Sequence, residues 1–127
     1  WSELKGRNPE EFLCELIGSL PVKDVYISLD KDCLTNKFAL TNWEEGQMQL
    51  NELLLMLKVI REKLNIVGMD ITGDYSQVLI KGLCKRAISS LDHPKENFAA
   101  KLPISYVSAI NAQTNIRILD TLGVGRR

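Results

Sequence analysis

Three consecutive charged residues, Asp30-Lys31-Asp32, have the clearest chemical potential in the chain. They follow residues 22–29, a short β-branched and aromatic segment that is predicted to be a strand. Side chains alternate along a strand, so Asp30 and Asp32 are expected on one side with Lys31 opposite. Neighbouring carboxylates repel each other unless a cation or donor offsets them, and their hard oxygen ligands suit Mg²⁺ or Mn²⁺. The spacing predicts a divalent-metal site; alternatively, one Asp caps the following loop and the other is solvated.

A second acidic group follows another predicted strand, residues 65–71. Asp70 lies near the end of this strand, and Asp74 comes directly after Gly73. The ends of adjacent parallel strands are neighbours, so Asp74 is expected beside the first acidic pair. The alternative is that Gly73 and Asp74 only form a turn, since both are favoured turn residues.

The elements around these residues indicate a single α/β domain spanning 1–127. A helix is predicted to begin at Pro9 with Asn8 as its cap, and the apolar spacing predicts a second helix over 50–64. Further helices are expected over about 77–91 and 104–122, with prolines between them. A strand, a crossover helix and a second strand form a βαβ unit, which predicts a parallel sheet flanked by helices on both faces. Two strands are too few to close a core alone, so the domain is expected to be incomplete.

Composition narrows the possible classes of protein. The chain has 127 residues, 45% of them apolar and 25% charged, as in an ordinary globular domain. Sixteen basic and sixteen acidic residues give no net charge, which argues against a nucleic-acid partner. No apolar run approaches a membrane span, so no membrane partner is expected. A small-molecule substrate is expected instead, and homo-oligomerisation stays open.

The cysteines and the first residue indicate the cellular compartment and whether the chain is part of a longer protein. Cys14, Cys33 and Cys84 are odd in number and widely spaced, which predicts reduced thiols in a cytoplasmic protein rather than a disulfide framework. The chain opens at Trp1 instead of Met, so we expect it to be part of something longer.

Two motifs in a fixed order resemble those of a known family. The chain reads VYISLDKD at 25–32, then a loop containing Gly46, an amphipathic helix, and VGMDI at 67–71. This resembles the C-terminal half of the arginase/agmatinase/formiminoglutamase (ureohydrolase) family. That family has an apolar strand followed by S-x-D-x-D-x-x-D-P, a Gly-containing loop, a helix, and a strand of the form G-x-D-x-x-E-x-x-P. The resemblance covers about residues 22–76.

The resemblance implies an arginase-like three-layer α/β/α fold and a binuclear Mn²⁺ centre. Asp30 would match the Asp that bridges the two ions, and Asp32 the Asp that binds one of them. The ions would generate a hydroxide that attacks a guanidinium or related carbon and hydrolyses a C–N bond. The family's substrate-recognising Glu falls on Gly73, so Asp74, one position later, becomes the candidate substrate-binding residue.

The chain also departs from the family pattern. Thr35 and Asn36 replace the third Asp and the Pro of the metal motif, and the family's earlier His and Asp motifs have no counterpart before Asp30. The resemblance therefore implies the C-terminal portion of a ureohydrolase, or a degenerate relative of one.

Two other classes of protein remain as alternatives. The sequence DKDCLT at 30–35 also fits the first motif of haloacid-dehalogenase-type Mg²⁺-dependent phosphohydrolases, with Asp30 as nucleophile and Asp32 as general acid. The other alternative is a catalytically inactive structural or interaction domain. Among single residues, His93 is expected in a loop, Cys33 lacks an identifiable base, and Trp43 is expected to cover a helix or line a pocket.

Overall fold

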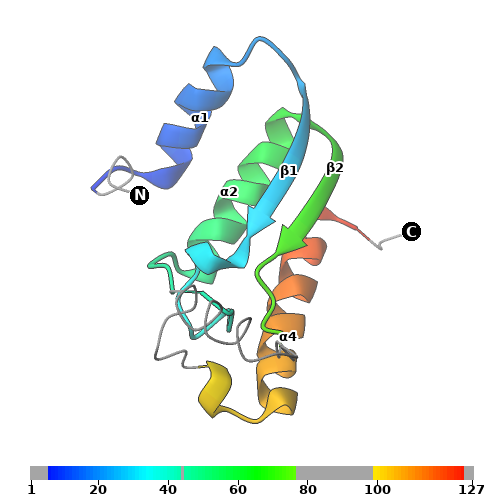
Figure 1. The fold of residues 1–127 in the computed structure, drawn as a ribbon. Helices are drawn as coiled ribbons and strands as arrows, with labels where there is room; N and C mark the ends of the chain where they lie inside the picture. The colour runs from blue at the N-terminus through cyan, green and yellow to red at the C-terminus, as the bar shows by residue number, and fades with distance from the viewer. Residues whose placement is uncertain (1–5, 44, 77–98, 125–127) are drawn as a thin grey trace, which may run out of the picture.

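The computed structural model describes residues 6–43, 45–76 and 99–124, which form an α/β fold (Figure 1). Its helices are α1 (Pro9–Ser19), α2 (Leu50–Lys63) and α4 (Ile104–Leu122), and its strands are β1 (Asp24–Asp30) and β2 (Asn65–Thr72). Two short 3₁₀ turns cover Lys31–Cys33 and Ala99–Lys101. The helix expected over 77–91, with Cys84, and the loop residue His93 lie outside the described residues.

Local sequence signals explain where the helices begin and end. Asn8 caps α1 as predicted, since its Oδ1 accepts a 2.9 Å hydrogen bond from the backbone N–H of Glu10. At the start of α2 the Glu52 side chain accepts a 2.7 Å hydrogen bond from the backbone N–H of Gln49, the residue before the helix. The helix α4 has its predicted bounds and ends at Gly123, whose φ of 76° is left-handed.

The predicted parallel sheet is confirmed. Strands β1 and β2 pair in parallel from Asp24 opposite Asn65 to Asp30 opposite Thr72, with one irregularity between Val25 and Tyr26. The helix α2 connects the two strands, which completes the βαβ unit. Both strands therefore end at the same edge of the sheet.

One face of the sheet carries the main core. Apolar side chains of both strands pack there against α2 and α4, and α1 packs on α2 through a smaller cluster. The fully buried members include Leu50 and Ile118. On the opposite face Tyr26 is exposed. The expectation that helices cover this second face as well is not tested by the residues that the structure describes, so it stays a prediction.

The long segment between β1 and α2 is irregular, as expected, and is anchored at several points. A short parallel bridge pairs Leu34 with Met48. Gly46 packs against the 3₁₀ turn so closely that a Cβ atom there would lie 2.0 Å from the carbonyl oxygen of Cys33. Only glycine fits at this position, and its close packing fixes the turn that follows β1.

The helix α4 holds the same segment from the other side. The Asn111 amide group bonds both backbone groups of Leu40, accepting from its N–H at 2.8 Å and donating to its carbonyl oxygen at 2.7 Å. One turn further, the Thr114 hydroxyl donates to the carbonyl oxygen of Phe38 at 2.5 Å. None of the helices in the described ranges has the length and apolarity to cross a membrane.

Candidate functional site

The carboxyl-terminal edge of the sheet brings the two predicted acidic segments together. Asp30 is the last residue of β1 and pairs with Thr72, the last residue of β2. Gly73 then turns with a φ of 82°, and a Cβ atom there would lie 2.6 Å from Oδ1 of Asp30. The chain after β2 therefore passes directly against the end of β1, where ligands bind in open parallel sheets.

The expected alternation of Asp30, Lys31 and Asp32 along one strand is wrong, because the strand ends at Asp30. Residues Lys31–Cys33 form a 3₁₀ turn. Oδ1 of Asp30 accepts a 3.1 Å hydrogen bond from the backbone N–H of Asp32, so Asp30 caps this turn. A short Asp side chain competes well for nearby backbone N–H groups, and this competition redirects the chain at the strand end. The capping role matches the alternative weighed from the sequence.

Asp32 carries an unusual carboxylate oxygen. Its Oδ1 is buried and, within the part of the chain that the structure describes, accepts no hydrogen bond. Burial raises the pKa of Asp32; a hydrogen bond with Thr41 opposes this rise, and the nearby charge of Asp30 adds to it. Burying a polar oxygen without a partner is unfavourable, so a donor or cation placed at this oxygen would relieve the cost.

Lys31 is the functional residue that the sequence reasoning missed. Its side chain is 0% exposed, and its ammonium group donates to the carboxylate of Asp74 and, at 2.9 Å, to Oδ1 of Asn115. Asp74 is much more open, with 55% of its side chain exposed. Lysine is almost never fully buried unless it is paired, so this ion pair explains the burial.

The sequence of α4, near the other end of the chain, does indicate that polar contacts form here. The helix α4 carries Asn111, Thr114 and Asn115 on its inner side, where apolar residues are the rule. Polar residues on an inward helical face require partners. That pattern predicts a polar contact, but not which residue provides it.

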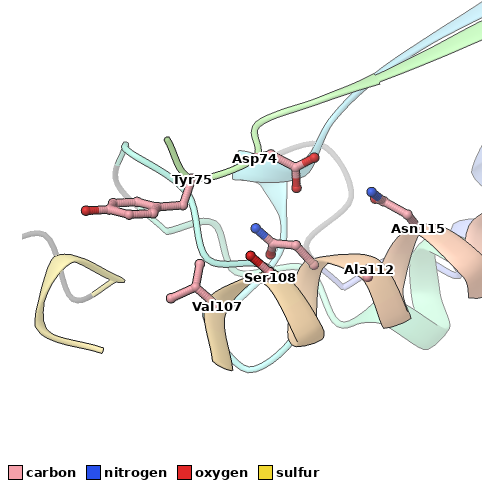
Figure 2. A pocket seen from close by; sticks show the side chains of 7 residues that line it. Asp74, Tyr75, Val107, Ser108, Ala112 and Asn115 are labelled. Atoms are coloured by element: carbon pink, nitrogen blue, oxygen red, sulfur yellow. The ribbon is translucent and has the colours of Figure 1, made fainter. Parts of the chain in front are cut away.

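A pocket of about 270 Å³ opens beside the buried ion pair. Asp74 and Tyr75, from the segment after β2, lie on one side of it, and α4 forms the other (Figure 2). The residues contributed by α4 are Val107, Ser108, Asn111, Ala112 and Asn115. Lys31 does not line the pocket, but both of its partners do. The pocket therefore combines an exposed carboxylate with amide, hydroxyl and aromatic groups.

The other candidate residues are less well placed for chemistry. Burial raises the pKa of the Cys33 thiol, and the charges of Asp30 and Asp32 raise it further, which disfavours the nucleophilic thiolate. Cys14 and Cys33 are free thiols, and Trp43 is exposed. Within the described ranges, no three or more His, Cys, Asp or Glu side chains are grouped as a metal site.

Comparison with known proteins adds no family assignment. No protein-family model matches the chain, and no curated protein matches it. The likeness to ureohydrolases therefore rests on the motifs at 25–32 and 67–71 alone.

Proposed function

We propose that this chain forms part of a divalent-metal-dependent hydrolase site of the ureohydrolase type. Asp30 and Asp32 bind the metal, and Asp74 contacts the substrate. The observation that carries the proposal is the buried Oδ1 of Asp32, which has no hydrogen-bond partner among the described residues and belongs to a carboxylate close enough to Asp30 for their charges to interact. The resemblance of the strand motifs to the ureohydrolase family adds Mn²⁺ as the preferred ion.

The donor set fits a hard divalent cation. Both groups are carboxylates, and a cation between them would relieve the repulsion and the burial that raise the pKa of Asp32. Two carboxylates fill only part of a Mn²⁺ coordination shell. Because two carboxylates would leave most of the shell to water, we expect this chain alone to bind Mn²⁺ weakly.

A divalent ion held by Asp30 and Asp32 would supply an activated water for hydrolysis of a C–N bond. The residues of this chain would do the positioning. Gly73 lets the chain after β2 approach Asp30, and the ion pair with Lys31 holds Asp74 at the mouth of the pocket. Cys33 has no part in this proposal, because its raised pKa keeps the thiol protonated near neutral pH.

Calorimetric titration with Mn²⁺ tests the metal site directly. The unmodified chain should bind Mn²⁺, and Asp30→Asn and Asp32→Asn should each weaken binding by about tenfold or more, since a neutral amide is a poor replacement for a charged ligand. Asp120→Asn, which removes an exposed carboxylate on α4, is the matched control and should bind like the unmodified chain. Equal binding by all four proteins would refute the assignment of Asp30 and Asp32.

Activity provides a second test in any longer protein that contains this segment. Asp30→Asn should abolish hydrolysis, because the loss of a ligand charge weakens the metal site. Asp74→Ala should mainly raise KM while metal content stays unchanged, since Asp74 contacts substrate and not metal. If Asp74→Ala emptied the metal site, Asp74 would be a ligand.

A further inference from the structure

The polar end of the pocket has an unusual charge balance. Asp74 and Asn115 both line the pocket, and both accept hydrogen bonds from the ammonium group of Lys31. That ammonium group is fully buried, whereas the Asp74 carboxylate is largely exposed. The carboxylate therefore faces a ligand with its charge already offset by a cation of the protein itself.

We infer that this pocket binds an uncharged polar group, a carboxamide or a group of similar shape, in preference to an ammonium or guanidinium cation. The group donates to the exposed oxygen of Asp74 and accepts from the side-chain N–H groups of Asn115. The inference deepens the proposed function, because it rests on Asp74 contacting the substrate and names the chemical class of the contacted group.

The charges around the pocket disfavour both a cationic and an anionic ligand. A cationic ligand on Asp74 would share one carboxylate with the buried ammonium of Lys31, and two like charges that share one partner repel each other. An anionic ligand would meet the exposed carboxylate itself, because the ammonium group of Lys31 is already paired with that carboxylate. A neutral group that has a hydrogen-bond donor beside an acceptor meets neither charge repulsion, and it can bond to both Asp74 and Asn115.

The rest of the lining suits a small group. Ser108 offers a hydroxyl group, and Tyr75 and Val107 offer apolar surface. A pocket of about 270 Å³ lies just below the usual size range of ligand sites, so it is suited to one terminal group of a ligand rather than a whole cofactor.

Three probes of nearly identical shape isolate the effect of charge. Propionamide is neutral, propionamidine is cationic and propionate is anionic at neutral pH. Titrated into the ¹⁵N-labelled chain without metal, propionamide should shift the side-chain amide signals of Asn111 and Asn115 at concentrations about tenfold lower than the other two. A preference for propionamidine, or no shift at these amides with any probe, would overturn the inference.

Charge variants make the test specific. Lys31→Met leaves the carboxylate uncompensated, so the preference should change to propionamidine. Asp74→Asn leaves the ammonium uncompensated, so the preference should change to propionate. The double variant, Lys31→Met with Asp74→Asn, removes both charges and should again prefer propionamide. It can be measured even if one of the single variants fails to fold. An unchanged preference in a folded single variant would refute the charge-balance argument.

Lys58→Met serves as the control, because Lys58 is an exposed lysine on α2 and its loss should leave the preference for propionamide intact. The outcomes for the two proposals remain distinguishable. If Asp30→Asn left Mn²⁺ binding unchanged while propionamide selectivity persisted, only the metal assignment would fail. If Mn²⁺ binding needed Asp30 but the pocket preferred the cation, only the present inference would fail.

Discussion

The ion pair between Lys31 and Asp74 should respond very unequally to loss of either partner. The lysine side chain is 0% exposed and the aspartate side chain is 55% exposed. Asp74→Ala leaves an ammonium group buried, whereas Lys31→Met leaves a carboxylate that water can solvate. The first change therefore strands a charge, and the second does not.

The magnitudes follow from these exposures. Breaking a buried pair by removing one partner costs about 3–5 kcal/mol when the remaining charge stays buried. Asn115 still accepts one hydrogen bond from Lys31, so Asp74→Ala should cost about 3 kcal/mol. Lys31→Met loses an ion pair to a largely exposed partner and fills the space with an apolar chain, so it should cost about 1 kcal/mol or less. The two variants should differ by about 2 kcal/mol.

Urea unfolding followed by far-UV circular dichroism measures this difference, provided that the denaturant slopes agree. Lys58 and Glu62 form the matched control, because they are 3.9 Å apart and both exposed. Replacing either of them should lower the free energy of unfolding by about 0.5 kcal/mol or less, and by the same amount for both residues. Equal costs for Lys31→Met and Asp74→Ala, or a larger cost for Lys31→Met, would refute the reasoning.

Three further changes test the loop and the edge of the sheet. Burial raises the pKa of Asp32 above 3.8, so the ionised carboxylate destabilises the folded chain at neutral pH. Asp32→Asn should therefore be more stable than the unmodified chain at neutral pH. This gain in stability should shrink as the pH falls through the raised pKa towards 3.8. Gly46→Ala should cost about 3 kcal/mol or more through its clash with backbone, whereas Gly18→Ala, exposed in α1 with open space around it, should stabilise by about 0.5 kcal/mol. Asn111→Ala leaves two buried backbone groups unpaired and should cost about 2–4 kcal/mol, against about 0.5 kcal/mol or less for exposed Gln113→Ala. Thermal and urea unfolding across pH measure the stability of all these variants. The predictions would be contradicted if Asp32→Asn lowered stability at neutral pH or if Gly46→Ala left stability unchanged. Equal losses of stability for Asn111→Ala and Gln113→Ala would contradict the third.

The elements of this fold were predictable because their signals are local. Asn8 and Pro9 mark the start of α1, and the apolar spacing over 50–64 predicts α2 with nearly its observed bounds. The helix expected over 104–122 corresponds to α4. The βαβ order then predicts parallel pairing, which the structure confirms. The exact end of β1 was not predictable, because the stop depends on one side chain, that of Asp30, bonding its own backbone.

The site was predictable only in part. The meeting of Asp30 with the Gly73-Asp74 turn follows from the shared edge of parallel strands. The burial of Lys31 does not, because it depends on Asn115, which lies 84 residues further along the chain. Alternation along a strand is a local rule, and it gives no information about a partner on a distant helix.

The helix α4 therefore belongs to the site as much as the strands do. Its inner polar side chains bond the loop at Phe38 and Leu40 and the ammonium group of Lys31. Each of these groups would be costly to bury alone, so the helix is stable in this position only while the loop and the lysine satisfy it. The same bonds bring α4 against Asp74 and close the pocket. The shape of the pocket and the docking of α4 are thus two consequences of one hydrogen-bond network, and a change that loosens the docking should also alter the pocket.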